Sequence, residues 1–469
     1  MIGRDKEKAT LLRLQQSQQS EFVAIYGRRR IGKTFLVRET FKQKFTFSHT
    51  GLANSKKDKQ LENFYNSLCK YGYNGKKPKD WLQAFMFLQT VITSSRSKKR
   101  IVFIDEVPWM DTPKSDFLPA LEHFWNDFAS ARKDILLIIC GSATSWIINK
   151  VFHSRGGLHN RTTCRIALQP FTLLECERYA KERKLALNRQ QITELYMALG
   201  GVAYYWSLLS SANSVAQSLD ELFFAVDAPL QEEFKELYAS LFKNPEPYIK
   251  VVEVLVKIRI GLTRNEISKT ANIESSGSLT TYLEELEQCG FLRHYNAIGV
   301  VKKGAIYQLI DNYSLFYFSF LYKSKPSDIH FWTNSLNTPR QNTWQGLAFE
   351  RVCMLHTEQI KSALGIAGVQ SDIYSWKTEA TDEYDGAQID MIIDRKDGII
   401  NLCEIKFTTK QFAITKSYYE NLENKLLSLK TQTKSSKSIH LTMITTKGIK
   451  NNTYSKNIPN SIVLDNLFT

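Results

Sequence analysis

The stretch that decides the fold runs from Glu21 to Thr34 and reads Glu-Phe-Val-Ala-Ile-Tyr-Gly-Arg-Arg-Arg-Ile-Gly-Lys-Thr. Its first part, Phe22 to Tyr26, has the length and apolar composition of a buried parallel strand. From Lys33 onward the apolar residues recur at helical spacing. Between the two lies the pattern G-x-x-x-x-G-K-T, which combines two flexible glycines with a lysine and a hydroxyl. This order predicts a phosphate-binding loop between a strand and a helix.

A loop in this position holds phosphate because its backbone N–H groups and the positive end of the helix dipole face the same point. We expect Lys33 to neutralise the β- and γ-phosphates of ATP and the Thr34 hydroxyl to bind Mg²⁺. The three arginines of the loop either add affinity for phosphate or face a partner chain. The expected nucleotide-binding residues are Gly27, Arg28, Arg29, Arg30, Ile31, Gly32, Lys33, Thr34, Phe35 and Ser142.

Two carboxylates end the next buried-strand pattern, Ile101-Val-Phe-Ile-Asp105-Glu106. Open α/β sheets bind their ligands at the carboxyl edge, so we expect both acids beside the loop, on the adjoining strand. Asp105 is expected to hold Mg²⁺ through water. Glu106 is expected to orient or deprotonate the water that attacks the γ-phosphate.

Two further polar residues are candidates at this site. Ser142 follows the buried run Ile135 to Cys140, and it either senses the γ-phosphate or caps the next helix. Arg161 ends the segment Gly156-Gly-Leu-His-Asn-Arg161, just before the strand-like run 164–169. It is a candidate catalytic residue that stabilises charge in the transition state, in cis or across a subunit contact.

The middle of the chain has two helical parts. Residues 171–244 carry few strand signals, and residues 245–310 follow the order of a winged helix-turn-helix. That order is made of helices at 248–260, 263–271 and 278–289 and wing strands at 291–295 and 305–310. The third helix has a serine- and threonine-rich start that suits DNA, but its outward face is acidic through Glu284, Glu285 and Glu287. DNA contact and an interdomain scaffold role are both open.

A second group of chemically active residues lies near the C-terminus. The loop Lys396-Asp-Gly398 joins two apolar strands as a three-residue hairpin loop. Counting back from it places Asp390 opposite Glu404, and strand alternation places Lys406 on the same face as Glu404. Two carboxylates and a lysine suit a divalent metal and a water that attacks a phosphodiester. The alternative is a surface hairpin with an ion pair.

The motifs I-G-R-x-x-E, Y-G-R-R-R-I-G-K-T, V-F-I-D-E-V-P-W, C-G-S and G-G-V-A-Y-Y together resemble the prokaryotic STAND ATPases of the AAA-like P-loop group, an archaeal-type ATPase family. The resemblance covers essentially the whole chain and implies ATP, Mg²⁺, a helical lid, a winged helix and a nuclease-like domain. The lid motif G-G-x-P reads Gly-Gly-Val-Ala at residues 200–203, without the proline. D…E-x-K resembles the restriction-endonuclease-like PD-(D/E)xK core, in which Glu350 matches the acid of the first helix. The resemblance therefore implies that Glu350 binds a metal ion together with Asp390 and Glu404.

The length and charge of the chain limit its possible domain organisation and partners. A chain of 469 residues exceeds one ordinary core. We expect an ATPase core at 1–170, a lid at 171–244, a winged helix at 245–310, and a linker helix with a nuclease-like domain at 311–469. The formal charge of +15 favours a polyanionic partner such as DNA, although a basic surface also serves solubility.

The sequence contains neither a secretion signal nor an apolar run of the ~20 residues that span a bilayer. Its seven cysteines form no C-x-x-C pair and are interpreted as buried small hydrophobes, so we expect a cytoplasmic protein without membrane contact. The prediction is an α/β P-loop ATPase that binds ATP and Mg²⁺ and is coupled to a DNA-binding or nuclease-like domain. Any DNA cleavage would depend on Asp390, Glu404 and Lys406 in that domain. The competing hypothesis is a nucleotide-switch regulator that does not cleave and binds DNA, a protein partner or a second copy of itself.

Overall fold

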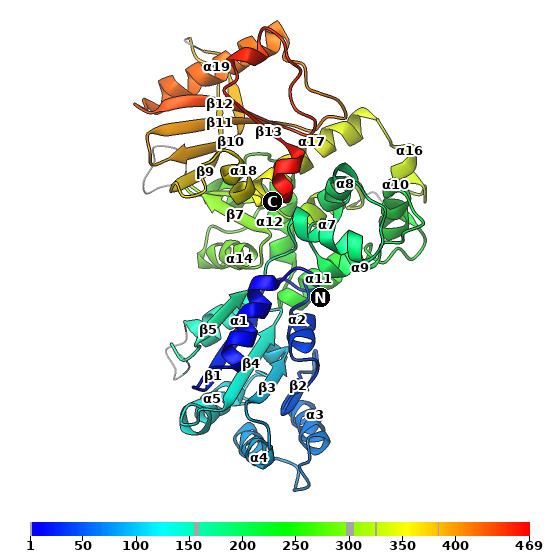
Figure 1. Cartoon of the computed structure of the whole chain (residues 1–469), viewed down its shortest axis with the longest axis vertical. Helices are drawn as coiled ribbons and strands as arrows, with labels where there is room; N and C mark the ends of the chain where they lie inside the picture. The colour runs from blue at the N-terminus through cyan, green and yellow to red at the C-terminus, as the bar shows by residue number, and fades with distance from the viewer. Residues whose placement is uncertain (1, 154–157, 159, 297–303, 324–325, 383) are drawn as a thin grey trace. The chain divides into compact units, whose positions relative to one another are not determined.

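The computed structural model describes residues 2–153, 158, 160–296, 304–323, 326–382 and 384–469 (Figure 1). Of the segment expected before the strand at 164–169, Gly156, Gly157 and His159 lie outside these residues. The chain divides into two compact units. One contains residues 1–170 with 240–243, and the other contains 171–239 with 244–469.

The first unit is built on a parallel five-stranded sheet with strand order β2-β3-β4-β1-β5. The five strands are β1 (Glu21–Tyr26), β2 (Phe47–Thr50), β3 (Arg100–Asp105), β4 (Ile135–Gly141) and β5 (Cys164–Ala167). Strands β1, β3, β4 and β5 lie where the sequence predicts strands, with shifts of one or two residues at their ends. The predicted α/β fold with a parallel sheet is therefore confirmed.

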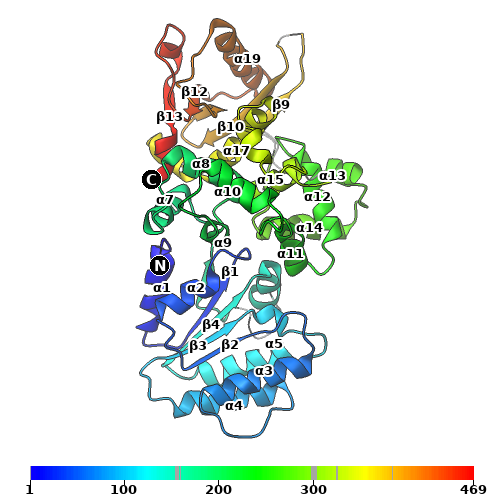
Figure 2. The ribbon, with the colours of Figure 1, turned by 90° about the vertical axis from the view of Figure 1, so that its right-hand side faces the viewer.

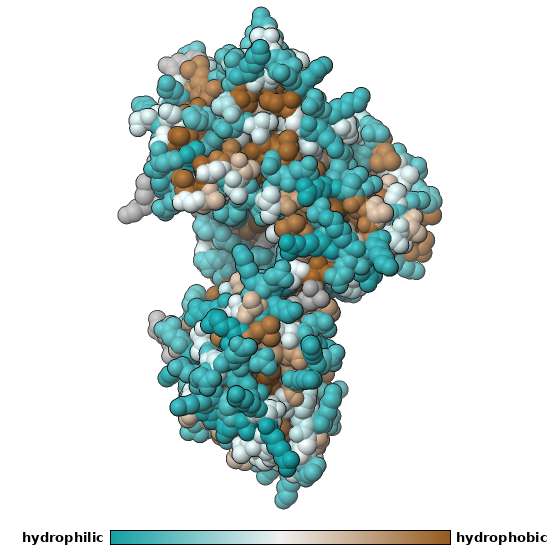
Figure 3. All heavy atoms as spheres, in the orientation of Figure 1, coloured by the Kyte–Doolittle hydropathy of each residue, from teal (hydrophilic) through white to brown (hydrophobic). Residues whose placement is uncertain are grey.

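Helices cover both faces of this sheet (Figure 2). One face packs against α3 (Lys57–Lys70), α4 (Trp81–Ser94) and α5 (Phe117–His123) through a cluster rich in aromatic side chains. The other packs against α1 (Asp5–Gln15) and α2 (Lys33–Thr40). In the lower half of Figure 3 the visible surface of this unit is mostly hydrophilic. The sheet is thus buried on both faces, which explains why its strands are continuous apolar runs.

The second unit begins with a helical segment. It contains α7 (Leu173–Glu182), α8 (Arg189–Leu199), α9 (Ala203–Ser207), α10 (Val215–Leu219) and α11 (Glu233–Leu241). Gly201 packs so closely that a Cβ there would lie 1.9 Å from the backbone oxygen of Phe171. His356 is buried beside this segment, where its Nε2 accepts from the Leu173 amide at 3.0 Å and burial lowers its pKa to about 4.

Three helices and a small sheet follow. They are α12 (Glu246–Val256), α13 (Arg264–Ala271) and α14 (Gly277–Gln288), with β6 (Leu262–Thr263), β7 (Leu292–Tyr295) and β8 (Ile306–Leu309) in the antiparallel order β6-β8-β7. The sequence predicts the two longer strands but not β6. It also predicts α12 to continue to residue 260. The helix instead ends at Val256, and Gly261, at φ +90°, completes the turn into β6.

The C-terminal part combines helices with a mixed five-stranded sheet of order β13-β12-β11-β10-β9. Its helices are α15 (Asn312–Phe320), α16 (Phe331–Asn334), α17 (Pro339–Leu355), α18 (Thr357–Ala363) and α19 (Lys416–Thr433). Its strands are β9 (Ser371–Thr378), β10 (Ala387–Arg395), β11 (Ile399–Lys406), β12 (Ser438–Thr445) and β13 (Asn460–Val463). Among the described residues no helix has the length and apolar character needed to cross a membrane.

All seven cysteines are free thiols. Cys140 and Cys403 lie within β4 and β11 and are fully buried, as their apolar surroundings predict. The prediction is wrong for Cys69, which is exposed near the end of α3, and Cys164 is only half-buried.

Candidate functional site

The phosphate loop lies between β1 and α2, and both of its glycines have positive φ. Gly27 has φ +137°, and a Cβ there would lie 2.3 Å from the backbone oxygen of Leu168. Gly32 has φ +92° and is the N-cap of α2, to which it contributes no side chain. Any side chain at position 27 would collide with the backbone. Because Gly32 has no side chain, no side-chain group caps the first backbone N–H groups of α2. The first turn of α2 is therefore the kind of helix N-terminus that binds phosphate.

Lys33 points back across the loop. Its ammonium donates to the carbonyl oxygens of Gly27 at 2.9 Å and Arg28 at 2.8 Å, and the side chain is buried. An incoming phosphate would meet this charge inside the curve of the loop. Lys33 thus lies where neutralisation of a β- or γ-phosphate requires it.

Thr34 and Asp105 are in direct contact. The Thr34 hydroxyl donates to Asp105 Oδ2 at 2.8 Å, and Asp105 is only 2% exposed. The expectation that the acids stand on the strand adjoining β1 is wrong, because β4 lies between β1 and β3. The contact forms nevertheless, since Thr34 lies in the first turn of α2 and Asp105 is the last residue of β3, at the carboxyl edge of the same parallel sheet. A hydroxyl and a carboxylate at one point are oxygen ligands that fit Mg²⁺.

Glu106 directly follows β3 in a left-handed conformation with φ 50°. Its Oε2 accepts from the Ser142 hydroxyl at 3.0 Å and from the Ser142 amide at 3.4 Å. Of the two roles expected for Ser142, helix capping is wrong. The N-cap of the next helix is Ala143, and the Ser142 hydroxyl binds Glu106 instead. Ser142 therefore orients the Glu106 carboxylate.

The other expected nucleotide-binding residues differ in exposure. Arg28 and Ile31 are buried, Arg29 and Arg30 are half-buried, and the Phe35 side chain is 56% exposed. Arg4 donates to the Ile31 carbonyl oxygen at 3.3 Å. It thereby ties the N-terminal segment to the loop. Only the family-like I-G-R-x-x-E string marks Arg4 in the sequence.

Arg161 lies away from the loop within its own unit. Strand β5 runs parallel to β1 with Cys164 beside Val23, so Arg161 lies level with the start of β1. The loop follows the other end of β1, about 20 Å away at the rise of a strand. The expected role of Arg161 in cis is therefore wrong. A role across a subunit contact stays a prediction for this exposed side chain.

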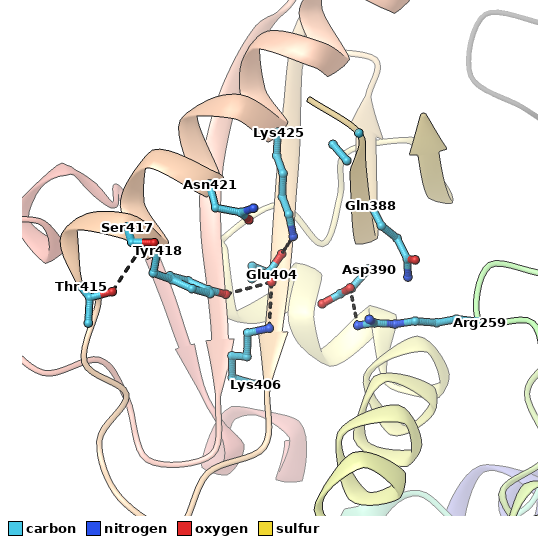
Figure 4. A pocket seen from close by; sticks show the side chains of 12 residues that line it. Arg259, Gln388, Asp390, Glu404, Lys406, Thr415, Ser417, Tyr418, Asn421 and Lys425 are labelled. Carbon is cyan, nitrogen blue, oxygen red and sulfur yellow. Dashed lines mark hydrogen bonds and ion pairs between the residues drawn. The ribbon is translucent and has the colours of Figure 1, made fainter. Parts of the chain in front are cut away.

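The second group of polar residues gathers on β10, β11 and α19. The pairing of Met391 with Cys403 and of Asp394 with Ile400 is the register that the three-residue loop predicts, and Gly398 has φ +88°. Asp390, Glu404 and Lys406 line one cavity of about 520 Å³ (Figure 4). The predicted convergence of these three side chains is thus present.

Glu404 is surrounded by donors. It accepts from Lys406 at 2.9 Å, from Lys425 at 2.7 Å and from the Tyr418 hydroxyl at 2.9 Å (Figure 4). Burial raises the pKa of Glu404, but the two lysines reverse this effect and lower it overall. Lys425 and Tyr418 come from α19 and were not predicted, because helical periodicity does not state which strand a helix face meets.

Asp390 and Glu350 share a different cation. Arg259 donates to Glu350 Oε2 at 2.5 Å and to Asp390 Oδ1 at 2.6 Å. Burial and the nearby Glu404 raise the pKa of Asp390 to about 7, and burial also raises the pKa of Glu350. Burial lowers the pKa of Arg259, while Asp390 and Glu350 raise it by more. No sequence pattern marks Arg259 as part of this site.

The expected metal set of Glu350, Asp390 and Glu404 is not assembled in this structure. Within the described ranges, no three His, Cys, Asp or Glu side chains are arranged to hold a metal ion. Instead, three cations compensate the three acids: Arg259, Lys406 and Lys425. As they stand, these residues do not fit a divalent cation.

The polar start of α14, expected to suit base edges, is already hydrogen-bonded. Arg264 donates to Thr280 Oγ1 at 3.0 Å, to Ser275 Oγ at 2.8 Å and to the Ser276 carbonyl oxygen at 2.6 Å. The acidic face of α14 is also engaged, since Glu287 contacts His294 at 2.6 Å. These internal contacts favour the scaffold role over contact with DNA.

Comparisons with known proteins agree with the fold of the first unit. Residues 1–209 match a family described as an ATPase domain predominantly from Archaea. An uncharacterized protein of Methanocaldococcus jannaschii is 26% identical over 326 residues, which cover 68% of this chain and 69% of that protein. Residues 1–209 thus contain an ATPase domain of the archaeal type.

Two solved structures superpose on much of this chain. A Walker-type ATPase of Pyrococcus abyssi superposes with a TM-score of 0.50 at 14% identity, over 68% of this chain and 96% of that one. The ORC2 protein of Aeropyrum pernix superposes with a TM-score of 0.42 at 15% identity, over 67% and 92%. At these identities the first likeness concerns the fold alone.

Proposed function

We propose that the first unit binds Mg-ATP at the loop Gly27–Thr34 and hydrolyses it. The observation that carries this proposal is the 2.8 Å contact between Thr34 and Asp105 beside the buried ammonium of Lys33. Together they place a hydroxyl, a carboxylate and a fixed positive charge at one edge of the sheet. The match of residues 1–209 to an ATPase domain supports the same activity.

The proposed mechanism assigns one task to each side chain. Lys33 and the loop amides bind the phosphate oxygens and stabilise the charge that develops during transfer. Thr34 and Asp105 would hold Mg²⁺, which would neutralise phosphate charge when bound. Glu106, oriented by Ser142, accepts the proton of the attacking water.

Lys33→Ala tests this proposal. Removing a unit charge about 4 Å from a phosphate costs about 4 kcal/mol at an effective dielectric constant of 20, or roughly 10³-fold in ATP affinity. Lys44→Ala, which removes an exposed lysine after the same helix, is the matched control. Titration calorimetry with Mg-ATP should detect binding for Lys44→Ala and not for Lys33→Ala. Equal binding by both variants would refute the assigned site.

We propose, as a second candidate function, that the C-terminal part acts on a nucleic acid, with DNA as the expected partner. The convergence of Asp390, Glu404 and Lys406 in one cavity supports a nuclease-like site. The arrangement of α12, α13, α14 and the β6-β8-β7 sheet supports a winged helix at 245–310, between a lid at 171–244 and a linker helix with a nuclease-like domain at 311–469.

One observation favours the competing function of a regulator that does not cleave. Glu350 and the two cavity acids Asp390 and Glu404 are already paired with three cations of the chain. A site in this state suits a nucleotide-dependent switch that binds DNA, a protein partner or a second copy of the chain. The two functions differ in whether the cavity ever takes up a metal and cuts.

Incubation of plasmid DNA with the full chain distinguishes the two. The reaction contains Mg²⁺ or Mn²⁺, with and without ATP, and compares wild type with Glu404→Ala, Lys33→Ala and the exposed control Glu420→Ala on α19. A nuclease predicts nicking by wild type and Glu420→Ala that Glu404→Ala abolishes. Nicking that survives Glu404→Ala would exclude this cavity as its source. Absence of nicking in all reactions would favour the regulator.

A further inference from the structure

Arg259 enters the acidic cavity from outside the C-terminal sheet. It lies in the turn between α12 and β6, and its guanidinium reaches Glu350 on α17 and Asp390 on β10. Both carboxylates are 4% exposed, whereas the Arg259 side chain remains 34% exposed. The cation is therefore accessible to solvent, while the two acids that it joins are not.

The turn that carries Arg259 is held from several sides. The Arg259 carbonyl oxygen accepts from Gln308 Nε2 at 2.7 Å and from Arg351 Nη2 at 2.9 Å. Gly261 passes so close to β8 that a Cβ there would lie 2.3 Å from the Tyr307 backbone oxygen. The position of the guanidinium is thus coupled to the small sheet and to α17. A displacement of that turn would withdraw it from both acids together.

The contacts of Arg259 are those that a divalent cation would make. A guanidinium recognises carboxylates through a planar fork of N–H donors, and its single charge offsets only part of two carboxylates. The oxygens of Glu404 are instead occupied by Lys406 and Lys425. Glu350 and Asp390 are the two acids that an ion could bind once the guanidinium is gone.

We infer that Arg259 substitutes for a divalent cation between Glu350 and Asp390, and that its withdrawal converts this closed ion-pair site into a metal site. This inference rests on the proposed nuclease-like site. It makes the turn after α12 the element that controls access to the acids. Movement of the segment α12–α14 then regulates the cavity without any change in the acids themselves.

Mn²⁺ binding to the purified full chain, measured by titration calorimetry and by the loss of free Mn²⁺ signal in electron paramagnetic resonance, tests the inference. Arg259→Gln should bind Mn²⁺ about tenfold or more tightly than wild type, because one positive charge leaves the acids. Lys257→Gln removes an exposed positive charge two residues away and should leave the affinity unchanged. Adding Glu350→Gln to Arg259→Gln should abolish the gain.

Arg259→Lys covers the case in which the glutamine variant does not fold. A lysine keeps the positive charge but not the planar fork of N–H donors. The Mn²⁺ affinity of Arg259→Lys should therefore be severalfold higher than that of wild type. Mn²⁺ should also raise the melting temperature of either Arg259 variant more than that of wild type. Affinities within about twofold of wild type for the folded variants would overturn the inference and leave a structural ion pair.

The outcomes separate this inference from the second proposed function. If an Arg259 variant gains Mn²⁺ binding and no protein nicks plasmid, the inference holds and the nuclease proposal fails. If wild type nicks plasmid and the Arg259 variants gain no Mn²⁺ binding, the nuclease proposal holds and the inference fails.

Discussion

Ser142→Ala tests whether the chain positions its proposed catalytic carboxylate by a single hydrogen bond. Glu106 Oε2 receives the Ser142 hydroxyl at 3.0 Å, whereas the Ser142 amide is at 3.4 Å, beyond the usual range of N–H···O bonds. A hydrogen bond to a charged group contributes about 1.5–3 kcal/mol. If half of that free energy orients Glu106, kcat should fall roughly 3- to 12-fold, since about 1.4 kcal/mol is a factor of ten.

Steady-state ATP hydrolysis at saturating Mg²⁺ measures this change. We expect kcat to fall and the affinity for a non-hydrolysable ATP analogue to stay unchanged, because Ser142 is not needed for the contacts of Lys33. Glu106→Gln provides the reference, with an expected loss of about 10²–10⁴-fold for a missing general base. In that background Ser142→Ala should have no further effect. A kcat within twofold of wild type for Ser142→Ala, or additive losses in the double variant, would refute the reasoning.

Three further predictions concern metal dependence, pH and packing. Asp105→Asn should keep the contact with Thr34 but raise the Mg²⁺ concentration needed for half-maximal hydrolysis about 10–100-fold. For His356 the folded pKa of about 4 lies below the ordinary 6.5, so its stabilisation is complete above pH 6.5 and lost as pH falls towards 4. Between pH 7 and 5, urea unfolding of wild type should lose about 2 kcal/mol more than that of His356→Gln. Gly201→Ala should destabilise by about 3 kcal/mol because its Cβ meets backbone at 1.9 Å, while Gly346→Ala, with no atom within 4 Å, should not.

The sequence predicts the first unit well because its signals are local. Each buried parallel strand is an apolar run. The phosphate loop follows one such run, and Asp105 and Glu106 stand at the end of another. The order of the strands in the sheet, by contrast, has no local signal in the sequence. Neighbours in the sheet are set by packing of helices over both faces, so no local pattern states that β4 separates β1 from β3. The prediction that the strand of Asp105 adjoins β1 was wrong for that reason, although Thr34 and Asp105 are in contact.

The residues of the C-terminal cavity could likewise be predicted only in part. Hairpin geometry fixes the register of β10 and β11, so the facing of Asp390 and Glu404 follows from counting residues. Arg259 is 131 residues before Asp390, and Lys425 is 21 after Glu404. Contacts between separate elements leave no periodic trace. The cations that decide the charge of the cavity therefore emerge only from the structure.

The backbone of Glu106 has a consequence for laboratory evolution. A glutamate in the left-handed region costs about 1 kcal/mol relative to glycine, so Glu106→Gly should relieve the backbone while deleting the carboxylate. A library screened only for survival after heating would then enrich glycine at this position. Heat-tolerant clones of this protein should accordingly be sequenced at residue 106 before their loss of ATP turnover is attributed to any other change.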